Sequence, residues 1–172
     1  FESNRFADAA REYERTAYDY PLHVKSSAAG YAALIAYQKH EPSLAGESFC
    51  SCDDVLGYYR PRMKELKKEV FRCALLDTKN KIIRDEEVSV GSLSASIVHP
   101  RDTFKAAIRE SAAAVIFIHN HPSGDTRPSQ EDILLTKRLV QAGEVLGIRV
   151  LDHIIIGDGT HFSFRDKGMI GP

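Results

Sequence analysis

Residues 113–119, with the sequence AAVIFIH, form a nearly continuous apolar run. Such a run is typical of a β-strand that is buried on both faces, inside a sheet covered by helices. The polar segment HNHPSGDTRPSQED follows at once, over residues 119–132, and carries histidines, carboxylates and turn-forming residues. The two stretches together predict an α/β domain whose reactive side chains gather at the end of a buried strand.

The rest of residues 51–172 predicts the other layers of this domain. Short runs rich in apolar and β-branched residues indicate strands, and apolar residues at every third or fourth position indicate helices. The expected strands are 70–77, 82–91, 113–119, 150–157 and 161–165, and the expected helices are 53–68 with a kink near Pro61, 100–111, and a long helix that begins after Ser129 and ends at Gly147. This order of elements predicts a mixed β-sheet flanked by helices.

Residues 1–48 have a different pattern and predict a small helical N-terminal segment. Apolar residues at helical spacing up to Pro21 indicate one helix, and the Ala-rich stretch 26–40 indicates a second. The sequence EPSLAGES, residues 41–48, is typical of a loop and marks the expected domain boundary. Because the chain begins at Phe1 without a methionine, we expect it to be a piece of a longer chain.

Composition limits the classes of partner. The chain has 172 residues, 43% apolar and 27% charged, which suits one globular core. No run approaches the roughly 18 apolar residues that indicate a membrane span, so we expect no membrane partner and a cytoplasmic location. The formal net charge of −1 gives no general attraction to nucleic acid, which is possible as a partner but has no support from charge.

Three cysteines, Cys50, Cys52 and Cys73, are the only ones in the chain. An odd number without an export signal indicates free thiols in a reducing compartment. The sequence Cys50-Ser51-Cys52 could contribute two metal ligands or a redox pair. A zinc knuckle would need further ligands at short spacing, and none lie nearby in the sequence. We therefore interpret the three as incidental thiols.

The polar segment contains three candidate metal ligands. Side chains alternate along a strand, so His119 and His121 project from the same face. Ser129 is a natural N-cap for the long helix, which puts Asp132 in its first turn and lets it supply a third ligand. Three protein ligands leave one position open on tetrahedral zinc, as in catalytic sites. The Ser129-x-x-Asp132 spacing also fits a capping box, although capping does not explain the histidines.

The spacing His119-x-His121, seven residues, Ser129, two residues, Asp132 resembles the JAMM (MPN+) metalloprotease signature in every position. Stretches such as VGSLSASIVHPRDTFKAAI resemble the RadC-like family, over roughly residues 51–170. The resemblance implies a JAMM/MPN fold, which is cytidine deaminase-like, and one Zn²⁺ per chain held by the two histidines and the aspartate. It also implies that the Ser129 hydroxyl steadies an oxyanion and that an upstream glutamate acts on the water.

Glu69 is our choice for that glutamate. In JAMM proteins the residue precedes an early core strand, and Glu69 stands just before VFRCALLD. Glu86 and Glu87, on the next expected strand, are the reserve candidates, and Glu65 is expected to be a solvated helix residue.

The resemblance implies a zinc-dependent metallopeptidase or isopeptidase, with a peptide or protein substrate that the sequence does not identify. Glu69 would take a proton from the activated water and pass it to the leaving amine. The alternative is a non-catalytic DNA- or protein-binding module associated with DNA repair, although residues 1–48 lack the Gly-hydrophobic-Gly turn of a DNA-binding helix-hairpin-helix. A metal-dependent nuclease fits less well, given the net charge.

Three other histidines are expected to have structural or solvated positions. His99 precedes Pro100 and is expected to cap or orient the following helix. His153 flanks an apolar strand and is expected to be a packed, hydrogen-bonded imidazole, whereas His161 near the hairpin turn is expected to be solvated.

Overall fold

The structure is a computed structural model and describes residues 48–91 and 98–171. The helices expected before residue 41, and the domain boundary expected near residue 48, therefore remain predictions. None of the helices in the described part of the chain is both long and apolar enough to cross a membrane.

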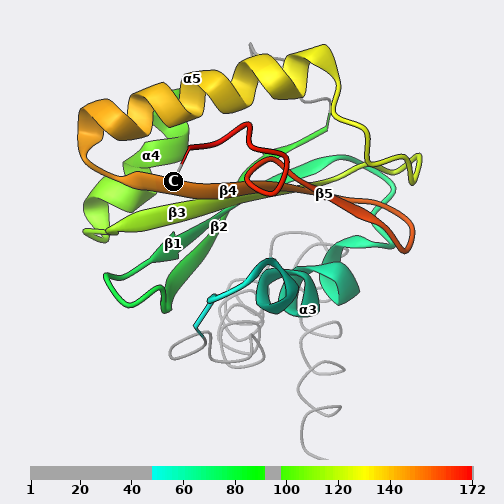
Figure 1. Cartoon of the computed structure of the whole chain (residues 1–172), viewed down its shortest axis with the longest axis horizontal. Coiled ribbons are helices and arrows are strands. Elements are labelled where there is room, and N and C mark those ends of the chain that lie inside the picture. The colour runs from blue at the N-terminus through cyan, green and yellow to red at the C-terminus, as the bar shows by residue number, and fades with distance from the viewer. Residues whose placement is uncertain (1–47, 92–97, 172) are drawn as a thin grey trace, which may run out of the picture. The chain divides into compact units, whose positions relative to one another are not determined.

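Five strands form one mixed sheet in the order β2-β1-β3-β4-β5 (Figure 1). The strands are β1 (Val70–Leu76), β2 (Ile82–Val90), β3 (Ala114–Asn120), β4 (Arg149–Ile156) and β5 (His161–Ser163). The helices of the described residues are α3 (Cys52–Met63), α4 (Pro100–Arg109) and α5 (Gln130–Leu146). The pairing of β3 with β4 is parallel, and the other strand pairs are antiparallel. The predicted α/β fold class, a mixed sheet flanked by helices, is confirmed.

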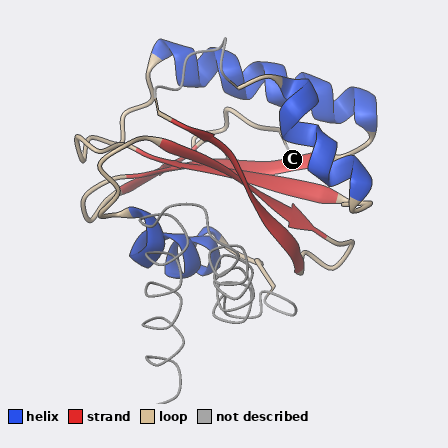
Figure 2. Ribbon diagram, turned by 180° about the vertical axis from the view of Figure 1, so that it is seen from behind, coloured by secondary structure: helices blue, strands red, loops and turns tan. Residues whose placement is uncertain are grey.

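Helices cover both faces of the sheet. Helix α3 lies against one face, and α4 and α5 lie against the other (Figures 1 and 2). Alternate residues of β1 and β3 enter two separate cores: Val70, Ala74, Ile116 and Ile118 pack on the α3 side, and Phe71, Leu75, Val115 and Phe117 pack on the α5 side. Every residue of β3 is buried, as the apolar run 113–119 predicted.

The ends of the helices follow local capping chemistry. Ser51 and Ser129 are the N-caps of α3 and α5, and each forms a complete capping box with the aspartate three residues later. His99 caps α4 by accepting a hydrogen bond from the Arg101 amide, as predicted. Gly147 ends α5 with a φ of 70°, a left-handed conformation that favours glycine.

The expected helix 53–68 was wrong at its C-terminal end. Helix α3 continues through Pro61 but stops at Met63. The carbonyls of Leu66 and Lys68 accept hydrogen bonds from the Asn120 side chain, at 3.4 and 3.1 Å, instead of continuing a helical ladder. Asn120, which is 52 positions from Lys68 in the chain, thus fixes the path of the segment that leads into β1. The last strand is also shorter than expected, since β5 ends at Ser163 and a turn follows.

Candidate metal centre

Strand β3 and helix α5 bring three metal-ligating side chains together. His119 lies near the C-terminal end of β3, and His121 follows just after that strand. Asp132 lies in the first turn of α5. One ligand atom from each of these residues lies within 4.8 Å of the others. His119 and Asp132 are buried, and His121 is half-buried, so the group opens to solvent on the side of His121.

The distances within the group suit one tetrahedral ion. The Nε2 atoms of His119 and His121 are 3.0 Å apart, and the Asp132 carboxylate lies 3.4 Å from the first and 3.5 Å from the second. Ligands bound at zinc distances on a tetrahedral ion are separated by about 3.3 Å. Two neutral imidazoles and one carboxylate also form a common donor set for zinc. The residues therefore fit the ion that the resemblance implies.

Asp132 belongs to the capping box and to this group at once. Its Oδ2 atom accepts hydrogen bonds from the amide and the hydroxyl of Ser129, both at 2.7 Å. Its Oδ1 atom faces Nε2 of His119. The capping interpretation of the Ser129-x-x-Asp132 spacing is therefore correct, and it leaves an oxygen of the carboxylate directed at the histidines.

A chain of hydrogen bonds supports His119 from behind. Its Nδ1 atom lies 2.8 Å from Nε2 of His153, and Nδ1 of His153 lies 2.6 Å from the Thr136 hydroxyl. The Thr136 hydroxyl in turn donates to the main-chain carbonyl of Asp132, at 2.6 Å. If Nε2 of His119 binds a metal as a neutral ligand, its proton lies on Nδ1, so each bond in the chain has a single direction.

The sequence predicted only part of the role of His153. The expectation of a packed, hydrogen-bonded imidazole was correct, since His153 is fully buried and stacks on Phe164 at a ring distance of 4.8 Å. Its contact with His119 was not predicted. The parallel pairing of β3 and β4 creates it, and the signal in the sequence was a polar pair, Asp152-His153, inside the otherwise apolar stretch 150–156.

The loop after β3 directs the second histidine. His121 Nδ1 lies 2.6 Å from the Asp125 carbonyl, which leaves Nε2 to face His119 and Asp132. The loop packs closely on the end of β4: a Cβ at Gly157 would meet the Gly124 carbonyl oxygen at 2.3 Å. A glycine at position 157 is therefore needed for the loop to take this position.

Glu69 lies beside the group. It directly precedes β1, two residues before Phe71, which is opposite His119 in the antiparallel β1–β3 pair. Because side chains alternate along an extended segment, Glu69 points to the same face as His119. Its negative charge contributes to a raised pKa of His121. Glu69 is half-buried, and its own carbonyl accepts a hydrogen bond from the Gly91 amide at 2.8 Å.

Asn120 clamps the segment that carries Glu69, and the sequence did not predict this role. Its side-chain oxygen accepts a hydrogen bond from the Val70 amide at 2.9 Å, and its nitrogen donates to the carbonyls of Leu66 and Lys68. One buried amide therefore holds the main chain on both sides of Glu69. One indication of this role is present in the sequence: Asn120 lies between two histidines and faces the opposite side of the strand.

The reserve glutamates are engaged elsewhere. Both lie on β2, which β1 separates from β3. Glu86 pairs with Arg84 at 2.8 Å, and Glu87 pairs with Arg72 at 3.2 Å. Glu65 is exposed and lies 3.8 Å from Lys64, as expected for a solvated residue. Glu69 is the candidate whose negative charge helps to raise the pKa of a histidine in the group.

Burial and close packing shift the pKa values of the three side chains in the group. Burial, together with the neighbouring His153, keeps the pKa of His119 well below its ordinary value. Burial alone would raise the pKa of Asp132, but His121, His119 and Ser129 outweigh it and hold that pKa well below its usual range. The hydrogen bond with Asp132 raises the pKa of His121. A neutral imidazole and an ionised carboxylate are the protonation states that a metal ion requires.

The fold and this group of side chains define an α/β domain with a candidate metal centre between its buried strand β3 and the start of α5. Residues 49–169 match the family described as the RadC-like JAB domain, and the chain belongs to that family. The family resemblance seen in the sequence is therefore confirmed.

Relatives with high identity occur in several organisms. The chain is 51% identical over 149 residues to a UPF0758 protein of Methanosarcina acetivorans, covering 85% of this chain and 65% of the relative. It is 57% identical over 124 residues to a UPF0758 protein of Trichlorobacter lovleyi, covering 72% of this chain and 54% of the relative. The chain thus spans between about half and two thirds of the length of these relatives.

Proposed function

We propose that this domain is a zinc-dependent metallopeptidase or isopeptidase. His119, His121 and Asp132 would hold one zinc ion, Glu69 would be the general base, and Ser129 would stabilise the oxyanion. The observation that carries this proposal is the convergence of two imidazole Nε2 atoms and one carboxylate on a single point, with the half-buried Glu69 on the same face. A structural site would need no base, and it would be closed by a fourth ligand.

A zinc ion bound there would lower the pKa of a water molecule towards about 7 and polarise the carbonyl of the scissile amide. Glu69 accepts the proton that this water loses and donates it to the departing amine, so the products are a carboxylate and an amine. Because Asn120 holds the main chain on both sides of Glu69, the carboxylate needs little reorganisation to do so.

Ser129 supplies a hydrogen-bond donor for the oxyanion. Its oxygen is fixed by the Asp132 amide at 3.1 Å, while its hydroxyl hydrogen points to Oδ2 of Asp132. Rotation about the Cβ–Oγ bond turns that hydrogen toward a substrate without moving the oxygen. A donor fixed in this way favours the transition state in which negative charge develops on the carbonyl oxygen.

A digest of proteins into a mixed peptide library provides a test without a known substrate. The zinc-loaded chain is incubated with the library, and new peptide termini are identified by mass spectrometry. We expect new termini from the parent protein that disappear in Glu69→Gln and His121→Ala. Glu65→Gln is the matched control, because Glu65 is exposed and paired with Lys64; it should cleave as the parent does.

The variants also separate this proposal from its rival. If the zinc-loaded parent produces no more new termini than Glu69→Gln, the chain acts as a binding module in these conditions and the peptidase proposal fails. Zinc retained by Glu69→Gln and reduced by His121→Ala would still identify the ligands, because the base does not hold the metal.

A further inference from the structure

Cys52, His161 and Asp166 form a second group of metal-ligating side chains. One ligand atom from each lies within 4.8 Å of the others. Cys52 is the first residue of α3, His161 begins β5, and Asp166 lies in the turn that follows β5. His161 is opposite Ile156 in the β4–β5 pair, and Ile156 belongs to the core under α3, so His161 points to the α3 face of the sheet.

We propose that this group binds a divalent transition-metal ion of the zinc type, through the Cys52 sulfur, the His161 imidazole and the Asp166 carboxylate. A thiolate and an imidazole select zinc over magnesium or calcium, which prefer oxygen ligands. The ligands come from two ends of the domain's sequence, so the bound ion would join the start of α3 to the β5 turn. It is separate from the group on the α5 face.

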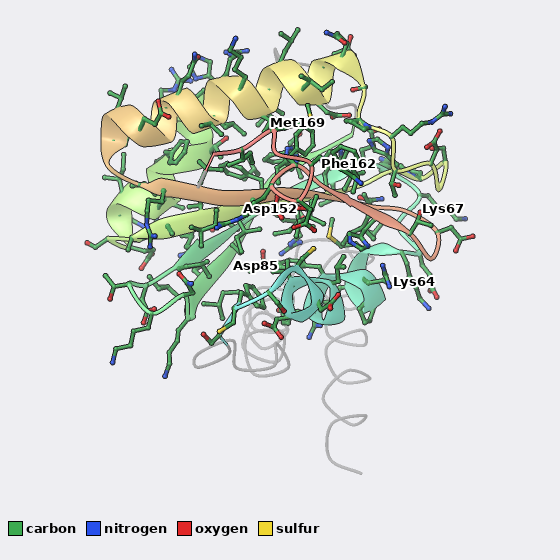
Figure 3. All side chains as sticks on the ribbon, viewed as in Figure 1. Lys64, Lys67, Asp85, Asp152, Phe162 and Met169 are labelled. Atoms are coloured by element: carbon green, nitrogen blue, oxygen red, sulfur yellow. The ribbon has the colours of Figure 1, made fainter. Side chains whose placement is uncertain are left out.

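Two carboxylates lie near the Cys52 thiol. Cys52 is half-buried, and the carboxylates of Asp152 and Asp166 line the same hollow together with Arg149 and Arg165. Asp152 lies on β4, two residues from Ile154, and thus faces α3 (Figure 3). The negative charge of the two carboxylates attracts a metal ion, which then displaces the thiol proton. In the described ranges 48–91 and 98–171, the ring of His161 and the carboxylate of Asp166 form no hydrogen bond or ion pair.

The fold supplies the ligands that the sequence around Cys50 and Cys52 lacks. Their short spacing offered no further ligand nearby in the chain, whereas β5 and its turn bring a histidine and an aspartate to Cys52. Cys50 is exposed and lies 3.5 Å from the Ser48 hydroxyl. Cys50, Cys52, Asp152 and Asp166 line a surface hollow of about 460 Å³, which gives an ion access from solvent.

Cobalt(II) distinguishes the two sites by their ligands. A thiolate bound to cobalt gives an intense near-ultraviolet charge-transfer band, and the group of His119, His121 and Asp132 contains no sulfur. The metal-free full chain is titrated with cobalt(II) alone under reducing conditions. We expect a charge-transfer band in the parent. Its intensity should stop rising once one cobalt ion per chain is bound to sulfur. The band should be lost in Cys52→Ser and His161→Ala.

Two further variants serve as matched controls. Cys50→Ser and His121→Ala should both keep the band, since neither removes a ligand of this site. The proposal is overturned if the parent has no band, or if the band persists in Cys52→Ser or His161→Ala. His161 is exposed, so its replacement leaves the core intact, and circular dichroism checks this. A failed peptidase test leaves the band unchanged, so the two proposals fail independently.

Discussion

The imidazoles of His119 and His153 are hydrogen-bonded to each other at 2.8 Å, and neither has exposed surface. Their strands, β3 and β4, are parallel neighbours, so the contact between the rings is a product of the sheet's topology. In this arrangement His153 fixes which nitrogen of His119 is left to face Asp132 and His121.

Replacing His153 should weaken metal binding without removing a ligand. His153→Phe keeps the ring stack on Phe164 but leaves Nδ1 of His119 without an acceptor, and we expect zinc affinity to fall about 10- to 100-fold. Competition with a chromophoric chelator measures this, in a Cys52→Ser background that excludes the second site. His153→Gln, which offers an acceptor oxygen, should recover part of the affinity. Equal zinc affinity in His153→Phe, His153→Gln and the parent protein would show that His153 does not support metal binding by His119.

Sequence patterns predicted most of the fold because strands and helices depend on local periodicity. The apolar run 113–119 predicted a strand buried on both faces, and Ser129 predicted the start of α5. The positions that the sequence did not predict depend on distant contacts. The Asn120 side chain meets carbonyls 52 and 54 residues away, and His153 meets His119 across 34 residues. No local pattern encodes such pairs.

Asn120→Ala should lower both stability and catalytic rate while zinc remains bound. The substitution removes three hydrogen bonds to the segment around Glu69 and leaves the buried Val70 amide without its acceptor. We expect the free energy of unfolding to fall by about 1–3 kcal/mol. Urea unfolding measures the stability, and zinc content and peptide cleavage are measured on the same samples.

Asn120→Asp is the matched variant for that experiment. It retains an acceptor for the Val70 amide but loses the donors to Leu66 and Lys68. Unchanged cleavage in both variants would show that the position of Glu69 does not depend on Asn120.

The two capping boxes allow one interaction to be tested in two settings. Ser51 and Ser129 each form a complete capping box, at the start of α3 and α5, and either change to alanine should cost about 1 kcal/mol of stability. Only Ser129→Ala should also reduce the cleavage rate, since Ser51 has no metal-binding histidine beside its aspartate. Thermal unfolding and peptide cleavage compare them. Similar cleavage by both variants would contradict a catalytic role for Ser129.

Acid should destabilise the metal-free protein through its buried imidazoles. Burial lowers the pKa of His153 to about 3 and holds that of His119 well below its usual 6.5. Below pH 6.5 the unfolded chain gains protons that the folded chain does not, so stability is present above this pH and lost as the pH falls. Each histidine contributes a slope of up to about 1.4 kcal/mol per pH unit.

Urea unfolding in the presence of a chelator, between pH 6.5 and 5, measures this slope. His153→Phe should remove about half of it, because His119 still titrates only on unfolding. His161→Ala, which removes an exposed imidazole, is the comparison variant. The raised pKa of His121 acts mainly above this window, where it lowers stability as the pH rises, and it opposes the slope only near pH 6.5. A flat profile in the parent would contradict the buried, neutral state of both rings.

Ser129 and Asp132 cap α5 and also belong to the candidate site, so their presence in a related sequence has two explanations. A relative that binds no metal would still need the serine and the aspartate to begin α5. His119 and His121 have no comparable second task in holding a helix end. Survival of the Ser-x-x-Asp pair is thus poor grounds for inferring an active enzyme, and survival of the histidine pair is much better grounds.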